Sequence, residues 1–328
     1  MKLKSLSFHL LAMLLVLVLA GALLEMGMRI AFARSMDFDI EMWKYAMLLK
    51  QPSSNPRIGH EHKPHSRAFL MGADVQINSM GLRDIERPAA KPPGVKRILM
   101  LGDSLTFGWG VEMTDTPSRL LAQHFSAHGS EVDVINSGVG NYNTDMEVSY
   151  FFQEGVKLDP DLVVLNYFIN DAETTPAQQT GFFRQNSYAF AFISGRIGIL
   201  FRQLGSSPDW KEYYRALYED SNPGWERAKA AIARLAAYCH QHNIPIIVVN
   251  YPELHELNPY PFLDVTAKLH AAAMSSQAEF LDLLPAVKGI EPKSLWVSPM
   301  DAHPNAASNR AFAKLLFDTI TLKFATDR

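Results

Sequence analysis

Apolar and polar positions divide the 328-residue chain into three stretches. Residues 8–24 form a Leu-rich run without Asp, Glu, Lys or Arg, whereas residues 35–95 are mostly polar and contain several prolines. From residue 96 onward, short apolar runs alternate with longer amphipathic ones. We therefore predict an N-terminal membrane helix within residues 1–34, an extension over 35–95 and a globular domain over 96–328.

The globular stretch has the pattern of an α/β fold. Apolar residues at three- and four-residue spacing predict helices at 224–242 and 305–323, and Thr116 followed by Pro117 marks the start of another helix. Helices that alternate with short β-branched or Leu-rich runs are typical of βαβ units and of a parallel sheet covered on both faces. Five strands are predicted, at 97–101, 132–136, 162–167, 245–250 and 280–283.

The extension carries local signals of its own. A short helical pattern near 41–49 precedes a polar segment that contains His60, His62 and His65, and residues 75–77 indicate a small β element before a turn. Three neighbouring histidines suggest a metal site, but this loop offers no regular scaffold for ligands. We expect solvated histidines there, and we expect no metal or other cofactor in the protein.

Residues 182–204 form a second unusually apolar segment. They are rich in Phe, Ile, Leu and Ala, and only Arg184, Arg196 and Arg202 are charged. We favour a helix packed against the sheet. A lid over the functional site and shallow insertion into a membrane surface are the alternatives.

The N-terminal run has the composition of a membrane segment. At about 1.5 Å per residue, residues 8–24 extend roughly 26 Å, which spans the hydrocarbon core with help from flanking residues. We expect an uncleaved single-pass anchor in a bacterial-type inner membrane, with Lys2 and Lys4 in the cytoplasm and the chain beyond about residue 35 in the periplasm. The alternatives are a cleaved signal peptide, with an A-x-A-like site at 31–33, and a buried core helix.

Composition excludes several classes of protein. The chain is 48% hydrophobic and 20% charged, as in globular proteins, and its net charge of -3 comes without a Lys/Arg-dense block. Nucleic acid is therefore not an expected partner, because duplex binding depends on clustered cations. Because Cys239 is the single cysteine, no internal disulfide can form. It lies in an apolar helical pattern and is expected in the core.

Ser104 is the candidate nucleophile. It follows the predicted strand 97–101 directly, at the carboxyl end where open parallel sheets place their ligands. A serine hydroxyl needs a base to take its proton. His303 is the best candidate of eleven histidines, because it lies in a loop before the C-terminal helix and Asp301, two residues earlier, is available to orient its imidazole.

Three short blocks resemble, in sequence and in order, those of the GDSL/SGNH hydrolase superfamily: Gly102-Asp103-Ser104-Leu105, Asn170-Asp171 and Asp301-Ala302-His303. The resemblance covers residues 96–324. It implies a flavodoxin-like three-layer α/β/α fold with a five-stranded parallel sheet, a covalent acyl-Ser104 intermediate and chemistry without a metal.

The resemblance also implies an oxyanion hole. Its donors would be the backbone N–H of Ser104, a backbone N–H of the second block and the side-chain amide of Asn170. The residues agree for Asn170, which falls just past the predicted strand 162–167 and could donate to a tetrahedral oxyanion. In the second block Asn141 occupies the position of the family's usual glycine, with Gly140 as the alternative donor.

The sequence departs from the family pattern at three positions. Asn141 replaces a glycine, but Asn tolerates a left-handed backbone better than most residues. Phe168 stands where the third block usually has glycine, which predicts a narrower acyl pocket. Met300 occupies the usual position of the acid, so either Asp301 or a backbone carbonyl orients His303. Asp103 is expected to cap the turn after Ser104 rather than to transfer protons.

These observations favour an extracytoplasmic serine esterase that removes O-acyl groups, most simply acetyl, from a glycan or a small molecule. The glycan is implied by the resemblance and the predicted compartment. A polysaccharide O-acetyltransferase with the same acyl-Ser104 intermediate is the alternative, and a catalytically idle accessory protein of envelope polysaccharide assembly is another.

Overall fold

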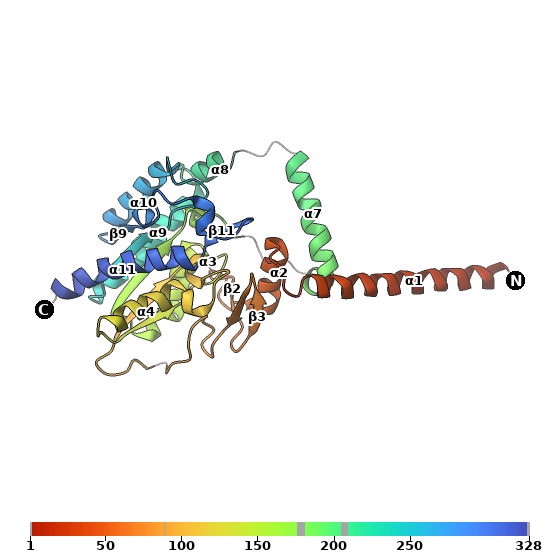
Figure 1. Cartoon of the computed structure of the whole chain (residues 1–328), viewed down its shortest axis with the longest axis horizontal. Coiled ribbons are helices and arrows are strands. Elements are labelled where there is room, and N and C mark those ends of the chain that lie inside the picture. Colours follow the sequence, from red (N-terminus) through yellow and green to blue (C-terminus); the bar gives the residue numbers. More distant parts are fainter. Residues whose placement is uncertain (1, 89, 176–180, 205–208, 327–328) are drawn as a thin grey trace.

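The computed structural model describes the whole chain except residues 1, 89, 176–180, 205–208 and 327–328. Its centre is a parallel five-stranded sheet with the strand order β6-β5-β7-β8-β9 (Figure 1). The strands are β5 (Lys96–Leu101), β6 (Val132–Asn136), β7 (Leu162–Tyr167), β8 (Ile246–Asn250) and β9 (Glu279–Asp282). All five predicted strands are thus confirmed, in the order of a flavodoxin-like fold.

Helices cover both faces of this sheet. On one face α4 (Pro117–Ala127) packs against α11 (Ala306–Thr326), and the other face carries α5 (Thr144–Gln153), α9 (Pro223–Gln241) and α10 (Leu263–Ser275). Strands β7 and β8 are buried along their whole length, as expected for a parallel sheet between two helical layers. Cys239 is fully buried on α9, as predicted.

Small antiparallel pieces surround the carboxyl edge of the sheet. In the extension, α2 (Phe38–Leu48) is followed by the pair β1 (Lys50–Pro52) and β2 (His60–His62), then by β3 (Arg67–Leu70) and β4 (Ala73–Gln76). Nearer the C-terminus, β10 (Trp296–Ser298) pairs with β11 (Asp301–Pro304). The small β element of the extension is therefore confirmed, while the boundaries drawn at residues 35 and 95 stay predictions.

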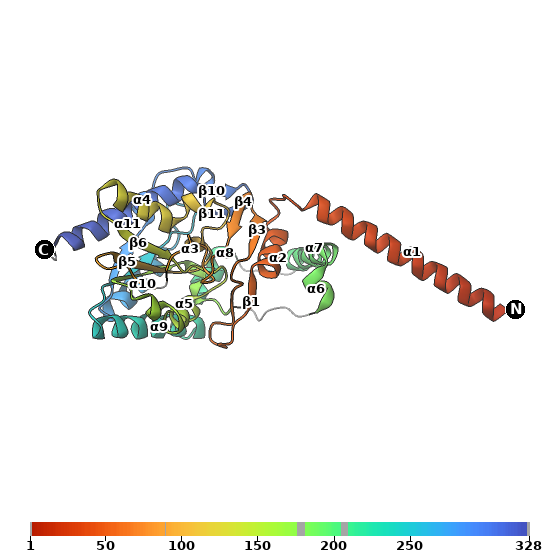
Figure 2. The ribbon, with the colours of Figure 1, turned by 90° about the horizontal axis from the view of Figure 1, so that it is seen from below.

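Helix α1 (Lys2–Ala31) projects from the rest of the molecule in both views (Figures 1 and 2). Within it, Ser7–Ala31 has a mean hydropathy of 2.5 and none of its most apolar window is buried by the protein. The interpretation of this run as a core helix is therefore wrong, because no other element covers it. The exposed apolar helix is consistent with a signal sequence or an anchor.

The apolar segment after residue 181 forms α6 (Phe182–Asn186) and α7 (Tyr188–Leu204), which are followed by α8 (Trp210–Leu217). Helix α7 packs against α1 and α2 and stands apart from the sheet (Figure 1). The prediction of a helix packed against the sheet is wrong. The physical reason is that both faces of the sheet are already covered, one of them by α5, α9 and α10.

Candidate active site

Ser104 lies at the turn between β5 and a short helix, α3 (Ser104–Phe107). The Asp103 carboxylate caps this helix by accepting a hydrogen bond from the Leu105 backbone N–H at 2.9 Å, as predicted. Gly102 is required by close packing, because a Cβ at this position would lie 2.0 Å from Thr106 Oγ1. The turn thus holds the Ser104 hydroxyl at the carboxyl edge of the sheet.

The β10–β11 hairpin brings the candidate base to this serine. His303 Nε2 lies 2.9 Å from Ser104 Oγ, and His303 Nδ1 lies 2.5 Å from Asp301 Oδ1. Met300, at the family's usual acid position, is 86% exposed and carries no carboxylate. The geometry favours Asp301 over a backbone carbonyl as the partner of His303.

Asp301 is buried and satisfied by three donors. Oδ1 accepts from Nδ1 and from the backbone N–H of His303, the latter at 3.1 Å, and Oδ2 accepts from Trp109 Nε1 at 2.8 Å. Burial raises the pKa of the Asp301 carboxyl, but its interactions with His303 and Trp109 outweigh burial and hold that pKa below its ordinary value of 3.8. Asp301 is therefore a carboxylate at neutral pH, as stabilisation of an imidazolium requires.

Asn170 lies on a short 3₁₀ helix, η3 (Ile169–Ala172), just past the end of β7. Among the residues that the structure describes, nothing donates to its buried Oδ1. Asn170 also lines a cavity of about 300 Å³ at the foot of His303, together with Phe38, Leu105, Phe168 and Tyr214. A side-chain amide in this wall could donate to an oxyanion, and Phe168 narrows the same space.

The second block forms a loop that contacts Tyr45 of the extension. The Gly140 N–H donates to Tyr45 Oη at 2.8 Å, which occupies the donor that the alternative oxyanion role would need. Asn141 adopts a left-handed backbone with φ of 67°, a conformation that Asn tolerates better than most residues. Asn141 is not among the residues that line the cavity, so its oxyanion role stays a prediction.

Lys50, a residue of the extension, also contacts the second block and is not identifiable from the sequence. Its buried ammonium donates to the Gly140 carbonyl at 2.5 Å and to Asn141 Oδ1 at 3.0 Å. Burial lowers the pKa of Lys50 well below its ordinary value of 10.5. A lone lysine before Gln51 and Pro52 gave no signal of burial, because only the folded extension brings it to the second block.

Two histidines of the extension are buried, and the prediction that they are solvated is wrong. His62 Nε2 lies 2.7 Å from Tyr45 Oη and Nδ1 lies 3.2 Å from the Gly81 carbonyl, while His60 contacts the Gly140 carbonyl at 3.1 Å. Burial, followed by the charge of Lys50, lowers the pKa of His60 to about 4 and that of His62 to about 3. His65 is exposed, as expected.

Buried carboxyl groups lie beneath the site. Asp171 accepts a hydrogen bond from Thr144 Oγ1 at 3.0 Å. Burial, together with the nearby charge of Asp103, raises the pKa of Asp171 well above 3.8, and burial likewise raises the pKa of Glu147. The raised pKa favours the neutral form of the Asp171 carboxyl, next to Asn170, where an oxyanion would be stabilised.

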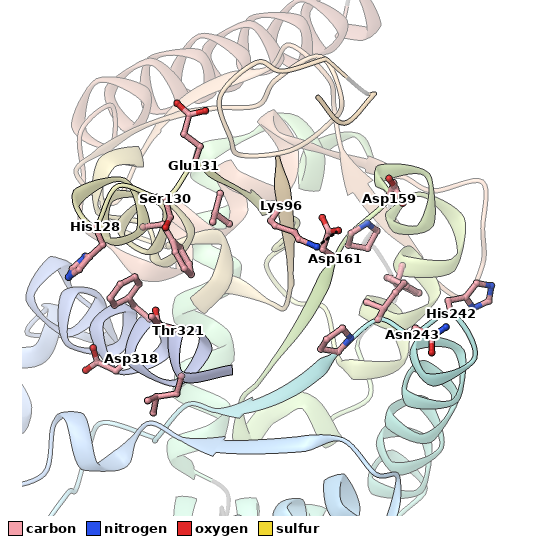
Figure 3. Close-up of a pocket in the computed structure, with 18 of the residues that line it drawn as sticks. Lys96, His128, Ser130, Glu131, Asp159, Asp161, His242, Asn243, Asp318 and Thr321 are labelled. Carbon is pink, nitrogen blue, oxygen red and sulfur yellow. Dashed lines mark hydrogen bonds and ion pairs between the residues drawn. The ribbon is translucent and has the colours of Figure 1, made fainter. Parts of the chain in front are cut away.

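A larger hollow, of about 1680 Å³, lies at the opposite edge of the sheet, where the strands begin (Figure 3). Lys96 and Asp161 face each other across part of it at 3.5 Å. The other polar side chains labelled in Figure 3, among them His128, His242 and Asp318, are spread around its rim. No nucleophile and base come together among its lining residues, so the carboxyl edge remains the candidate site.

A serine that contacts a histidine, which in turn contacts a carboxylate, at the carboxyl edge of a parallel sheet is typical of serine hydrolases. The model of the GDSL-like Lipase/Acylhydrolase family matches residues 100–311. The chain belongs to this family, and it is an acylhydrolase that acts on ester bonds. No curated protein matches it.

Several solved structures are similar to the chain. They include TesA (13% identity over 69% of this chain and 98% of that one, TM-score 0.46). LAE5, an alpha/beta hydrolase enzyme from the metagenome of Lake Arreo, Spain, has 17% identity over 68% and 94%, with a TM-score of 0.46. EstA, a psychrotrophic esterase from Pseudoalteromonas sp., has 14% identity over 70% and 99%, with a TM-score of 0.44. These likenesses concern the fold alone.

Proposed function

We propose that the protein is a membrane-anchored, extracytoplasmic serine esterase that removes small O-acyl groups, most simply acetyl, from a glycan. The observation that carries the proposal is the continuous contact from Ser104 Oγ through His303 to Asp301, beside a cavity of only about 300 Å³. A cavity of this size with Phe168 in its wall suits a short acyl chain.

In the first half of the reaction, Ser104 Oγ attacks the ester carbonyl carbon. His303 Nε2 takes the hydroxyl proton while the carbonyl oxygen becomes an oxyanion, for which Asn170, Asn141 and the Ser104 backbone N–H are the proposed donors. The imidazolium then gives its proton to the leaving alkoxide, and the bond between the carbonyl carbon and that oxygen breaks. An acyl-Ser104 ester and a free alcohol result.

In the second half, water attacks the acyl-Ser104 ester. His303 accepts a proton from the water and returns one to Ser104 Oγ, which releases the carboxylic acid. If a sugar hydroxyl replaced water, the same steps would transfer the acyl group, and the enzyme would be an O-acetyltransferase. His303 is partly exposed, with 21% of its side chain accessible, so water can reach the base.

The anchor is part of the proposal. Helix α1 contains an exposed apolar segment of 25 residues, about 38 Å long at 1.5 Å per residue, which is enough to cross a bilayer. With Lys2 and Lys4 in the cytoplasm, the catalytic domain lies in the periplasm. Recovery of the full-length chain in detergent extracts supports this topology, whereas a shortened soluble chain means that a signal peptide is removed.

Release of p-nitrophenol from p-nitrophenyl acetate by the detergent-solubilised full-length chain tests the chemistry. We expect Ser104→Ala and His303→Ala each to lower kcat/KM by about a thousandfold or more, because members of such a unit fail together. His65→Ala, which changes an exposed histidine of the extension, should leave the rate unchanged. Full activity of Ser104→Ala would exclude the proposed nucleophile.

The glycan is tested separately by measuring acetate released from an O-acetylated polysaccharide. Release that depends on Ser104 supports the proposed substrate. Hydrolysis of p-nitrophenyl acetate without release from any O-acetylated polysaccharide would contradict it. Transfer of acetyl to added glycan instead of water would replace the esterase with the acyltransferase.

A further inference from the structure

Helices α6 and α7 present an apolar face that the rest of the protein leaves uncovered. Phe190, Ile193 and Ile197 recur at intervals of three and four residues, which places them on one side of α7. They are 38%, 48% and 48% exposed, and on α6 Phe182 and Phe183 are 74% and 66% exposed. Such a row of large exposed side chains marks a surface that another apolar phase covers.

The N-terminal end of α7 is fixed to the end of α1. The Glu25 carboxylate accepts hydrogen bonds from Ser187 Oγ at 2.8 Å and from the backbone N–H groups of Tyr188 and Ala189, each at 3.1 Å. A carboxylate from α1 thus satisfies the first N–H groups of α7. This contact also explains why the apolar run of α1 contains an acidic residue near its end.

Further contacts hold the two helices at a set distance and direction. Arg29 donates to the Asn186 carbonyl at 2.7 Å, and the rings of Phe32 and Phe192 pack with centroids 5.2 Å apart. Arg196 of α7 forms an ion pair with Asp37. Helix α7 is therefore attached at the level of the last turns of α1 and of the residues that follow it.

The direction of α7 is the decisive observation. In Figure 1 it runs across the direction of α1, and in Figure 2, turned by 90°, α7 is seen nearly end-on beside α1. If α1 crosses the bilayer, α7 lies roughly parallel to the membrane plane, at the depth where α1 leaves the hydrocarbon. An amphipathic helix with an exposed apolar face is typical of that depth.

We propose that α6 and α7 form an interfacial helix pair, with Phe182, Phe183, Phe190, Ile193 and Ile197 inserted into the outer leaflet of the bilayer that α1 spans. The proposal rests on the anchor proposed above. Lipid is favoured over a second copy of the chain because α7 is fixed to the end of the apolar helix α1 and runs across it, at the level of a membrane surface. The pair would hold the catalytic domain in one orientation rather than let it swing on a tether.

The orientation has a consequence for the site. Phe38, which begins α2 seven residues after the end of α1, stacks on His303 with ring centroids 6.1 Å apart. The catalytic edge of the sheet therefore faces the membrane, and the hollow of Figure 3 lies at the far end. This placement favours esters presented at the membrane surface, such as those on a lipid-linked glycan.

Site-specific fluorescence quenching tests the proposal on the full-length chain. The only natural cysteine, Cys239, is buried, and Cys239→Ala removes it. In that background, single cysteines introduced by Ile193→Cys, Met13→Cys and Met274→Cys are labelled with a polarity-sensitive fluorophore. Met13 lies in α1, and Met274 is an exposed residue of α10 in the catalytic domain. The labelled proteins are reconstituted into phosphatidylethanolamine–phosphatidylglycerol bilayers that contain lipids with a nitroxide at a shallow or a deep acyl position.

We expect the label on α7 to be quenched most strongly by the shallow nitroxide, the label on α1 by the deep nitroxide, and the label on α10 by neither. A quenched α1 label with an unquenched, water-exposed α7 label would overturn the proposal and leave the anchor intact. An α7 label that is shielded from water but not quenched would mean that another protein surface, such as a second copy, covers this face. If no label is quenched, the anchor itself fails, and this proposal with it. Activity on p-nitrophenyl acetate shows that each variant is folded.

Discussion

Replacing Asp301 with asparagine exchanges one carboxylate oxygen for an N–H₂ donor in a site where every neighbour is a donor. The two orientations of the new amide have different consequences for the base. If its NH₂ faces Trp109, the remaining oxygen still accepts from His303 Nδ1, and Nε2 can take the Ser104 proton. If its NH₂ faces His303, the amide donates to Nδ1, the hydrogen moves to Nε2, and the imidazole cannot act as a base.

The structure indicates which orientation prevails. The productive orientation sets the amide against Trp109 Nε1, a buried donor 2.8 Å away, whereas the unproductive one conflicts only with the His303 backbone N–H at 3.1 Å. A buried donor left without an acceptor costs about 1–3 kcal/mol, and the cost is larger for the buried Trp109 indole than for the part-buried His303 N–H. We therefore expect Asp301→Asn to favour the wrong tautomer and to lower kcat/KM by about 10⁴-fold, the loss known for such a change in a serine triad.

Trp109→Phe should then have opposite effects on kcat/KM in the parent enzyme and in the Asp301→Asn variant. In the parent it removes a hydrogen bond from a buried carboxylate, so we expect kcat/KM to fall several-fold. In the Asp301→Asn background it removes the donor that opposes the productive amide orientation. A preference of about 1.4 kcal/mol for that orientation corresponds to a recovery of about tenfold.

The assay is kcat/KM for p-nitrophenyl acetate in the parent, the two single variants and the double variant. Unfolding midpoints of all four show whether loss of the indole, which is 2% exposed, has disturbed the fold. If Trp109→Phe lowers the rate by the same factor in both backgrounds, Trp109 acts only through packing. A role of Trp109 in selecting the amide orientation, and through it the tautomer of His303, would then be refuted.

Two further predictions concern the acyl cavity and the extension. Phe168→Gly should enlarge the cavity and raise the preference for p-nitrophenyl butyrate over acetate by about tenfold or more, since one methylene in an apolar pocket is worth about 1–3 kcal/mol; an unchanged ratio would mean that the acyl chain lies elsewhere. Burial lowers the pKa of His62 from 6.5 to about 3, so the unfolded chain binds more protons below pH 6.5 and stability falls as the pH falls. Between pH 7 and 5 the loss from this residue is about 2 kcal/mol, and His62→Gln should remove that part of it in denaturant titrations. If the free energy of unfolding depends on pH equally in the parent and in His62→Gln, protonation of His62 does not destabilise the folded state.

The fold was predictable because its signals are local and repeated. Five apolar runs of strand length, separated by amphipathic segments, define a parallel sheet whatever the details of the loops. The segment of α7 could not be placed in this way. Its apolar composition suits a core helix, a lid or a lipid surface equally, and only the tertiary contacts with Glu25 and Phe32 distinguish among them.

The residues of the candidate site likewise differ in whether local sequence or long-range contacts place them. Ser104, Asn170 and His303 follow strand ends or precede a helix, positions that the pattern of elements itself identifies. Trp109 and Lys50 could not be assigned, because each reaches the site through a contact between segments distant in sequence. The buried His62 was misjudged for the same reason, since a polar local sequence does not reveal the neighbours that later enclose it.

The extension is consequently more than a spacer between α1 and the α/β domain. Tyr45 accepts from the Gly140 N–H, Lys50 donates to the Gly140 carbonyl and to Asn141, and Phe38 stacks on His303. One short element after α1 therefore contacts both the base and the loop with the proposed oxyanion donor. Helix α2 is thus in contact both with α7, the proposed membrane-surface helix, and with the candidate site. A chain cut at residue 35 would keep these contacts, whereas one cut at residue 95 would lose them all.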